Sequence, residues 1–529
     1  MVSVAAHNPQ LELFFGSGVP GRPTVFSGRA IKLGKSKRKQ ARRIYLEGLW
    51  LARSEFEAGG KITVSVNEKD KTVTLLLDPH GERTISGKTK RGKRIPVIDL
   101  ELPELDRLFA SAEQLVVRPA LKGGEIVISR SDAERLRDER RRAKPNDMEV
   151  SLYSGAGLLS LAANIAGART VLGVEKWDEA RSAFEALHQA PALPVGVEEV
   201  ALGEALRPGS WGLPRNPWLL TAGVPCEPYS KLGGKGIEAR DPHELADQIY
   251  WTLLLILSMN PQNVVIENVP QFLRTAGGFV RALAFLGYHV YAAEVDPHAY
   301  GYVTGRSRAV IVATTEPAEP FPEPRRRSEQ VSDVLLPPET RVLYELPERQ
   351  GGWFSVADGE RKHKAWVVAG RSAAKKVTGI DVSLYQWLHG LDAEGRKKES
   401  FSKPTIVEYG DDRIPAVPKS MWKGSPTGPY VHHPRKRDLY RFLTVEELRR
   451  IHGVPARAAQ SLPGQDEYAL ATQLYGQAVH VPIFAEIIER LPGGRRHKKT
   501  ITARNPFPVV PLWYGYGPLY SVLPWGAIR

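Results

Sequence analysis

Cys226 is the residue whose type and position most directly suggest chemistry. It is the only cysteine among 529 residues, so it can form neither an intrachain disulfide nor a multi-thiolate metal site, and we predict no metal. The apolar run 218–222 predicts a buried strand, and a Gly-Val-Pro turn separates it from the thiol. Ligands of open α/β sheets bind at the carboxyl ends of strands, so a thiol there is a candidate nucleophile. A lone cysteine is also often an inert core residue, and on the thiol alone that alternative stays open.

Glu267 is a second candidate, near the end of another predicted strand. Residues 263–269 read NVVIENV, so an apolar triplet precedes Glu267 and Asn268. A carboxyl group held protonated by burial can donate a proton to a reacting group. The alternative is a carboxylate that only caps the following helix.

A glycine turn at Gly155 and Gly157 predicts a cofactor site. The turn follows a predicted strand, and Glu175 ends the next strand, 20 residues after Gly155. A carboxylate in this position can accept hydrogen bonds from ribose hydroxyls. Ser160 replaces the third glycine of the dinucleotide fingerprint. The pattern therefore favours an adenosyl cofactor without a pyrophosphate.

Alternating elements must position these residues. Strands are predicted at 148–153, 170–174, 195–200, 218–222, 263–269, 289–295 and 308–315, and helices at 158–167, 178–189, 243–260 and 277–288. This alternation predicts an α/β fold with a doubly wound, mostly parallel, Rossmann-like sheet.

The composition changes after residue 315. Residues 316–440 are rich in proline, glycine and charge, and basic clusters at 325–327, 361–364 and 434–437 are interleaved with Trp353, Trp366, Trp387 and Trp422. The tryptophans suit a small core, and the mixture also suits a domain that reads a nucleic-acid groove. Helical patterns return at 443–453 and 479–491, and Thr444 with Glu447 forms a predicted capping box.

The charge balance favours a polyanionic partner, although an acidic membrane surface or solubility alone would also account for it. Lysine and arginine number 73 against 59 acidic residues, a net charge of +14. We find no apolar run of about 18 residues, so no membrane span is expected. The first ten residues lack the layout of a secretory signal, and a single cysteine gives no sign of an oxidising compartment, so we expect a cytoplasmic protein.

The N-terminal region predicts a basic arm followed by a β-rich module. The arm ends in the basic run 35–43, and short strands follow at 61–66, 72–77, 94–100, 115–121 and 125–129. Residues 45–77 resemble the swapped-hairpin DNA-binding modules of small bacterial regulators and toxins, although Glu55-Phe56 stands where Gly-Phe is usual. A charged helix at 132–144 and a linker at 144–147 complete the region. No internal repeat is evident.

Six blocks, in order, resemble the cytosine-C5 DNA methyltransferases of bacteria and phages. They are SLYSGAGLLSLAANIAGARTVLGVEKW, GVPCEPYSKLG, VIENVPQFL, YGYVTGRSRAVIVA, RFLTVEELRRIHGVP and ATQLYGQAVHVPIFAEI. Together with the strand that opens at Met148, they span residues 148–491, with a long gap before the last two. The sequence departs from the family pattern at Ser151, where an Asp is usual, at Thr304, where a Gln is usual, and at Gln477, where an Asn is usual.

The resemblance implies a role for each matching residue. It assigns catalysis to Cys226, Glu267, Arg306 and Arg308, with both arginines on one face of a strand. It assigns S-adenosylmethionine binding to Tyr153, Gly155, Gly157, Leu158, Glu175, Lys176, Glu199, Pro225, Gly476, Gln477 and Val479. The implied reaction is methylation of C5 of a cytosine flipped out of double-stranded DNA, through a covalent bond between Cys226 and C6. The glycine-rich segment 231–241 is then a mobile lid.

The implied domains are an arm at 1–43, a β module at 44–145, a catalytic domain at 146–315 and 441–491, a target-recognition domain at 316–440, and a tail at 492–529. Rival functions are an RNA cytosine methyltransferase, a variant C5-modifying enzyme and a non-catalytic DNA-binding regulator. For residues 1–145 we expect DNA-backbone contacts, and the alternative is homo-oligomer formation.

Overall fold

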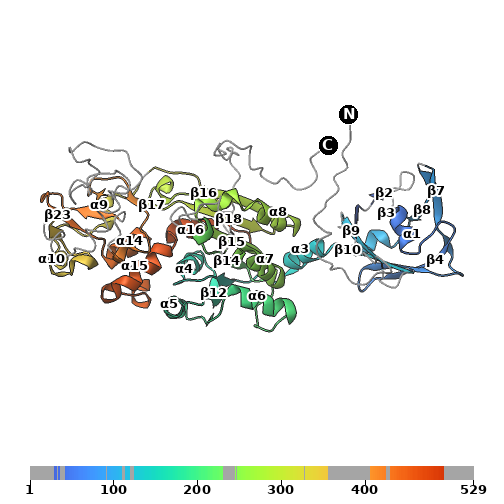
Figure 1. Ribbon diagram of the computed structural model, residues 1–529, viewed down its shortest axis with the longest axis horizontal. Helices are drawn as coiled ribbons and strands as arrows, with labels where there is room; N and C mark the ends of the chain where they lie inside the picture. Colours follow the sequence, from blue (N-terminus) through green and yellow to red (C-terminus); the bar gives the residue numbers. More distant parts are fainter. Residues whose placement is uncertain are drawn as a thin grey trace, which may run out of the picture. The chain divides into compact units, whose positions relative to one another are not determined.

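The computed structural model describes residues 29–32, 34–35, 42–90, 92–109, 114–119, 124–229, 245, 247–326, 328–355, 406–423 and 429–493. They belong to two compact units, Met1–Asp138 and Glu139–Arg529 (Figure 1). The predicted lid at 231–241, most of the predicted arm and the tail after residue 493 lie outside the described residues. Among the described residues, no helix is long and apolar enough to cross a membrane.

A seven-stranded sheet organises the second unit (Figure 1). Its order is β13 (Ala192–Leu193), β12 (Arg169–Val174), β11 (Met148–Leu152), β14 (Leu219–Gly223), β15 (Asn263–Asn268), β18 (Arg308–Thr314) and β16 (His289–Val295). The first five strands are parallel, and β18 is antiparallel to both of its neighbours. The predicted Rossmann-like, mostly parallel sheet is confirmed.

Helices connect the parallel strands. They are α4 (Leu158–Ile165), α5 (Asp178–His188), α6 (Val197–Leu206), α7 (Gln248–Met259) and α8 (Gly277–Phe285). The strand predicted at 195–200 is wrong, because α6 begins within it. Glu198 and Glu199 lie in the first turn of this helix, where acidic side chains complement the helix dipole. Val195 and Val197 have the spacing of a strand, whereas Val197 and Val200 have the spacing of a helix, and the segment is too short for its pattern to separate the two.

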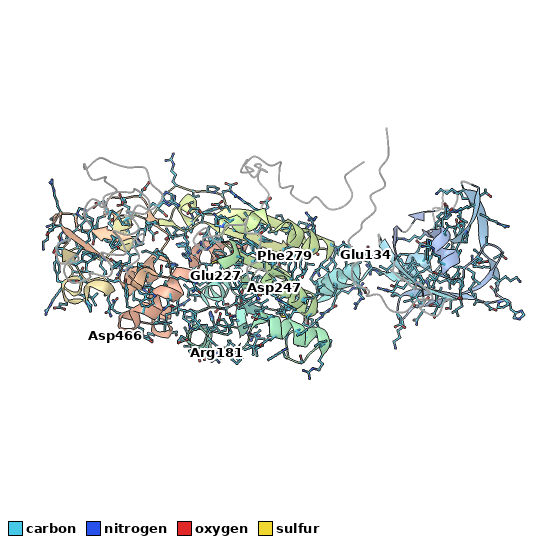
Figure 2. The ribbon with its side chains drawn as sticks, viewed as in Figure 1. Glu134, Arg181, Glu227, Asp247, Phe279 and Asp466 are labelled. Atoms are coloured by element: carbon cyan, nitrogen blue, oxygen red, sulfur yellow. The ribbon has the colours of Figure 1, made fainter. Side chains whose placement is uncertain are left out.

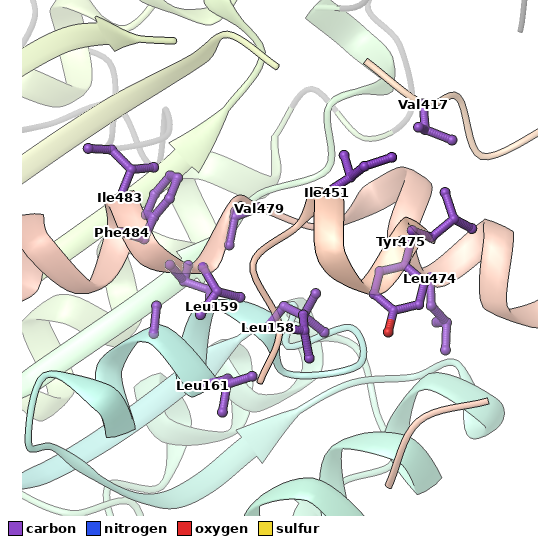
Figure 3. Packing of buried hydrophobic residues seen from close by; sticks show 14 of the residues in the cluster. Leu158, Leu159, Leu161, Val417, Ile451, Leu474, Tyr475, Val479, Ile483 and Phe484 are labelled. Carbon is purple, nitrogen blue, oxygen red and sulfur yellow. The ribbon is translucent and has the colours of Figure 1, made fainter. Parts of the chain in front are cut away.

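Three helices close the second unit: α14 (Val445–Ile451), α15 (Tyr468–Gln477) and α16 (Val481–Glu489). The predicted capping box of Thr444 and Glu447 is confirmed at the start of α14. α16 packs against α4, and Figure 3 shows Leu159 among Val479, Ile483 and Phe484. The end of the chain's described part therefore supports the helix that follows the predicted cofactor turn.

Short elements make up the region between β18 and α14. A four-stranded sheet has the order β19 (Phe354–Ser355), β23 (Leu439–Arg441), β22 (Tyr430–His432) and β20 (Ile406–Val407), and β17 (Thr304–Gly305) pairs with β21 (Ile414–Pro415). The short helices are α9 (Val331–Val334) and α10 (Val342–Glu345). Trp353 and Trp422 pack against the hydrophobic core, so these two tryptophans serve packing, whereas Trp366 and Trp387 lie outside the described residues.

The described part of the first unit contains two antiparallel sheets, two short helices and the first residues of α3 (Asp132–Arg142). The six-stranded sheet has the order β1 (Arg29–Lys32), β9 (Gln114–Pro119), β10 (Glu125–Arg130), β5 (Thr72–Leu77), β4 (Lys61–Asn67) and β6 (Arg83–Thr84). The four-stranded sheet has the order β2 (Gly34–Lys35), β3 (Arg42–Glu47), β8 (Lys93–Leu100) and β7 (Ser86–Lys90), with helices α1 (Leu49–Arg53) and α2 (Leu105–Leu108). All five strands predicted here are present, and the run β1-β2-β3-α1-β4-β5 recurs as β6-β7-β8-α2-β9-β10. The expectation of no internal repeat is therefore wrong.

The boundary between the units lies inside α3 (Asp132–Arg142), between Asp138 and Glu139. Arg140 is 2% exposed and donates to Asn260 Oδ1 and to the Leu286 carbonyl, both at 2.7 Å. Asn146, in the predicted linker, accepts from the backbone N–H groups of Met148 (3.1 Å) and Trp218 (2.9 Å). Arg140 and Asn146 thus bind segments next to the amino ends of the strands of the seven-stranded sheet.

Candidate active site

The predicted site residues follow four neighbouring parallel strands at their carboxyl ends. Gly155 follows β11, Glu175 follows β12 and Cys226 follows β14, while Glu267 is the penultimate residue of β15. From β11 the chain continues to β12 on one side of the sheet and later to β14 and β15 on the other side. The strand order therefore reverses between β11 and β14. Such a switch point is where open α/β sheets bind ligands.

Residues of β15 and the turn after it position the Cys226 loop. Asn268 donates from Nδ2 to the Val224 carbonyl at 3.2 Å, and the Tyr229 N–H donates to the Cys226 carbonyl at 3.0 Å. The Tyr229 and Phe272 rings meet edge to face with centroids 4.9 Å apart. Pro225 lies within this loop. Asn268 and Tyr229 are positioning residues that the sequence analysis did not assign.

Opposing influences act on the thiol. Burial raises the pKa of Cys226, and the carboxylates of Glu227 and Glu267 raise it further, while Arg308 and Lys419 lower it. Glu227, labelled in Figure 2, accepts from Lys419 Nζ at 3.0 Å. In this arrangement the thiol is mainly protonated at neutral pH. Protonation of Glu267 removes one of the two carboxylate charges that oppose thiolate formation.

Glu267 is a buried acid beside an arginine. It is 8% exposed, and burial raises its pKa while the charges of Arg308 and Arg306 oppose that rise. Arg308 Nε lies 2.5 Å from Glu267 Oε1. Gly223 pairs with Glu267 across the sheet, and a Cβ at Gly223 would lie 3.7 Å from Glu267 Oε2. The β14 turn therefore approaches the carboxyl group closely.

Arg306 and Arg308 do not share a strand, which corrects the expectation of alternation. β17 ends at Gly305 in one sheet and β18 begins at Arg308 in another, so Arg306 lies in the connection. Arg306 is 4% exposed and donates to three carbonyls, of Ala478 (2.6 Å), Gly476 (2.8 Å) and Val417 (3.3 Å). Arg308 contacts the Glu267 carboxyl group, whereas Arg306 connects the closing helices to the segment around Val417.

The glycine turn and Glu175 form one hydrogen-bonded unit. Glu175 Oε2 accepts from the Gly155 N–H and Oε1 accepts from the Trp177 N–H, both at 2.8 Å. Gly155 has φ 54° with open space beyond its Cβ position. Gly157 has φ 84°, and a Cβ there would lie 2.3 Å from His188 Nε2, so only glycine fits. Glu175 is half-buried, and each oxygen keeps a lone pair for a ligand.

Other predicted cofactor residues lie around this turn in different environments. Tyr153 donates from its hydroxyl to the Gln248 carbonyl at 2.9 Å, and burial raises its pKa. Leu158 is 4% exposed within the core, whereas Lys176 and Glu199 are exposed. The adjacent Glu198 is half-buried, and its charge contributes to the raised pKa of Tyr153. Glu198 is thus the acid of α6 nearer to the turn.

Gly476, Gln477 and Val479 are placed by packing between the closing helices and the region before them. A Cβ at Gly476 would lie 2.4 Å from the Lys419 backbone, so the segment at 418–419 requires this glycine. Gln477 is the last residue of α15, and Val479 is 3% exposed in the core. Gly476 thus brings the end of α15 close to residues 418–419.

Comparisons with known proteins agree with this geometry. A family model described as C-5 cytosine-specific DNA methylase matches residues 148–493. The chain belongs to this family. The type II methyltransferase M.MthTI of Methanothermobacter thermautotrophicus is 24% identical over 319 residues, which cover 58% of this chain and 86% of that protein. M.AluI of Cellulosimicrobium cellulans is 26% identical over 285 residues, which cover 48% of this chain and 53% of that protein.

Solved structures also match. A methyltransferase of Entamoeba histolytica, EhMeth, has a TM-score of 0.47 at 16% identity, over 66% of this chain and 98% of that chain. The Dnmt2 methyltransferase of S. pombe has a TM-score of 0.46 at 16% identity, over 65% and 97%. The match to the C-5 cytosine-specific DNA methylase model begins at Met148, the first residue of β11. The N-terminal unit lies outside it.

In this C-5 cytosine-specific DNA methylase, two of the departures from the family pattern, Ser151 and Thr304, have structural partners. Glu149 is fully buried and accepts from Ser160 Oγ at 3.0 Å and from Thr221 Oγ1, which also contacts Ser151 Oγ at 3.3 Å. Burial raises the pKa of Glu149 to about 7. Thr304 donates from Oγ1 to the Ile451 carbonyl at 2.5 Å. Ser151 and Ser160 thus belong to a polar network that joins β11, α4 and β14, which sequence spacing did not reveal.

Proposed function

We propose that the protein transfers a methyl group from S-adenosylmethionine to C5 of a cytosine flipped out of double-stranded DNA, through a covalent bond between Cys226 and C6. The observation that supports this most is the meeting of Cys226 and Glu267 at the ends of the adjacent strands β14 and β15. The coulombic influence of Glu267 on the thiol supports the same pairing.

Nucleophilic addition by Cys226 makes C5 reactive. The thiolate forms a bond to C6, the π electron pair of the C5–C6 bond becomes the C4–C5 double bond, and the π pair of the N3–C4 bond moves to N3. Protonated Glu267 donates to N3, so that the ring gains no net negative charge, and C5 becomes an enamine carbon. Arg308 lies beside the Glu267 carboxyl group and stabilises the carboxylate that this donation leaves.

The chain's own residues fit an adenosyl cofactor. S-adenosylmethionine supplies an electrophilic methyl group when bound. The open side of Gly155 leaves room at the turn, and the Glu175 oxygens accept from backbone N–H groups with lone pairs left for ribose hydroxyls. After methylation, C5 carries both a hydrogen and the methyl group. Loss of the C5 hydrogen as a proton to a base restores the C5–C6 double bond and releases the Cys226 thiolate. N3 returns its proton to the Glu267 carboxylate, which regenerates the neutral base and the acid.

Trapping the covalent bond tests this proposal. DNA containing 5-fluorocytosine cannot lose the C5 substituent as a proton, so the parent protein with S-adenosylmethionine should form a complex that survives denaturant. Cys226→Ala should form none and transfer no methyl group, because no other thiol exists in the chain. DNA with ordinary cytosine is the control. A stable complex with Cys226→Ala, or methylation of RNA but not of DNA of the same sequence, contradicts the proposal.

We also propose that sequence choice resides in residues 316–440. The region lies between β18 and α14, so its short elements can vary without changing the order of the catalytic sheet. Residues 417–419 contact Arg306, Gly476 and Glu227, so an exchange should keep them. Replacing 316–405 and 424–440 with the matching parts of a relative of known site should transfer the methylated sequence. Bisulfite sequencing measures this, and an unchanged sequence contradicts it.

A further inference from the structure

The N-terminal unit is a duplicated fold whose two halves pair with each other. The counterparts are β1 and β6, β2 and β7, β3 and β8, β4 and β9, and β5 and β10. When each strand is replaced by its counterpart, the orders β1-β9-β10-β5-β4-β6 and β2-β3-β8-β7 become the same orders read from the opposite edge of each sheet. The central pairs are β10 with β5 and β3 with β8, both antiparallel. Both sheets therefore share an approximate twofold relation between the halves.

Residues of the two halves correspond in register and burial. The hairpin β4-β5 pairs Ile62 with Leu77, and the hairpin β9-β10 pairs Leu115 with Arg130. The offset between halves is 53, since 115 − 62 = 53 and 130 − 77 = 53. Phe56 and Phe109 obey the same offset, and both are fully buried in one core. The core of this unit is thus completed by a second half that the same chain supplies.

The two most basic stretches of the unit are counterparts under this relation. Gly34-Lys35 pairs with Arg43-Arg42 in the hairpin β2-β3, and Gly87-Lys88 pairs with Pro96-Ile95 in the hairpin β7-β8. The offset is again 53. The sequence reads GKSKRK from residue 34 and GKTKRGK from residue 87, and no acidic residue occurs in 29–46 or 86–98. Runs of similar basic sequence thus begin at corresponding paired residues, Lys35 and Lys88, of the two halves.

The described hairpin β7-β8 is open to solvent. All five residues of β7 are exposed, as are Lys93 and Arg94 at the start of β8. The Lys88 and Lys90 side chains, 57% and 65% exposed, lie 3.3 and 3.4 Å from Glu47. Ion pairs this exposed are weak, so an external polyanion can compete for these lysines.

The hairpins lie at opposite ends of the four-stranded sheet. Ile44 of β3 pairs with Leu100 of β8, and this pair serves as a common reference point. Lys35 pairs with Arg42, which lies two residues before Ile44. Lys90 pairs with Lys93, which lies seven residues before Leu100. The separation is 2 + 7 = 9 residue steps, about 30 Å along the strands. One turn of B-DNA measures about 34 Å. Two equivalent basic hairpins at this spacing match the backbone of one duplex at positions one turn apart.

We propose that the N-terminal unit is a second DNA-binding site, in which the hairpins β2-β3 and β7-β8 of a single chain contact phosphates of the same duplex. The choice of DNA as the polyanion rests on the proposed function of the catalytic unit. Because the paired half is in the same chain, the unit needs no second protomer. Phosphate contacts supply affinity without base specificity and release counterions, so binding weakens as salt rises.

The salt dependence of binding by the full chain tests this proposal. Fluorescence anisotropy with a labelled duplex, without cofactor, gives the slope of log K against log salt for the parent, Lys35→Ala, Lys88→Ala with Lys90→Ala, and the triple variant. Each lost phosphate contact should lower the slope by about 0.9, additively across hairpins. Lys61→Ala with Lys69→Ala removes two exposed charges of β4 and the β4-β5 turn and should leave the slope unchanged.

Each outcome is decisive. Equal slopes for parent and triple variant, an effect from one hairpin only, or an equal loss in the Lys61 and Lys69 control overturns the proposal. If sedimentation shows a parent dimer that becomes monomeric in the hairpin variants, the unit serves protein association and the proposal is overturned. The proposal is also overturned if the hairpin variants lose RNA binding but keep DNA binding. Methyl transfer is assayed separately at saturating DNA. Its absence in the parent refutes the proposed function and leaves the binding result standing.

Discussion

The carboxyl edge of the catalytic sheet and the outer face of the four-stranded N-terminal sheet both carry charged side chains, in opposite environments. Glu267 and Arg308 pair with side chains 11% and 13% exposed, whereas the lysines beside Glu47 are more than half exposed. Charges in a low-dielectric site interact strongly and shift each other's pKa values, while water and salt screen exposed charges. We infer that the first set controls protonation at one atom and the second acts collectively on a polyanion.

Replacing the buried acid Glu267 should have the largest effect on the rate of methyl transfer. A small effect would contradict the contrast between buried and exposed charges. Glu267→Gln should slow single-turnover methyl transfer by roughly 10²-fold to 10⁴-fold, because N3 loses its proton donor. The exposed acid Glu294, on β16 of the same sheet, is the matched control, and Glu294→Gln should keep the parent rate. If Glu267 only caps a helix, the variant will lose about 1 kcal/mol of stability and little rate.

The pH profile sharpens the same point. The reactive form has a Cys226 thiolate and a protonated Glu267, and the pKa of each group is raised, mainly by burial. The population of this form rises with pH up to the lower of the two pKa values, stays constant between them, and declines above the higher one. In Glu267→Gln the rate should instead rise with pH up to the thiol's pKa. A parent profile that rises throughout contradicts the role of Glu267 as acid.

Glu149 should affect stability rather than chemistry. Its pKa is raised to about 7 in the folded state by burial, so between pH 4.5 and 7 the folded chain holds more protons than the unfolded chain. Stability therefore falls as pH rises through this window, by up to about 3 kcal/mol. Glu149→Gln should remove this loss, as urea unfolding at pH 5 and pH 8 would show. If the stability of parent and variant depends equally on pH, burial does not raise the pKa of Glu149 in this way.

Glu175 should have the smallest effect of the three. Glu175→Ala should weaken S-adenosylmethionine binding roughly 10-fold to 100-fold, the range for losing hydrogen bonds to a charged group. Isothermal titration calorimetry measures this. Asp178→Ala, which removes an exposed acid three residues away, is the control. Unchanged affinity, with a lowered melting temperature, would restrict Glu175 to holding the Gly155 turn.

The sequence predicted what depends on local pattern and strand direction. Apolar runs located the catalytic strands, and the rule that parallel strands end at one edge brought Cys226, Glu267 and the Gly155 turn together. Arg306 was different, because its alternation with Arg308 is interrupted where the chain leaves one sheet for another. No local pattern marks such a crossing. The partners of Arg306, at 417, 476 and 478, lie more than 100 residues away.

The polar network and the repeat were also missed for physical reasons. Glu149 is fully buried in β11, and its partners Ser160 and Thr221 come from other elements. The two N-terminal halves keep the pattern of buried residues but few identical ones. Phe56 and Phe109 match, while β8 is longer than β3. Their relation becomes visible only through strand pairing.

The duplication has a consequence for how this protein can change. A homodimer encodes both halves once, so every substitution appears twice and its two arms remain identical. Here each half has its own codons, and Gly92 already interrupts the second basic run where Lys39 continues the first. One hairpin can therefore be altered while the other still binds DNA. Selection or design can thus change the contribution of each hairpin to DNA binding separately.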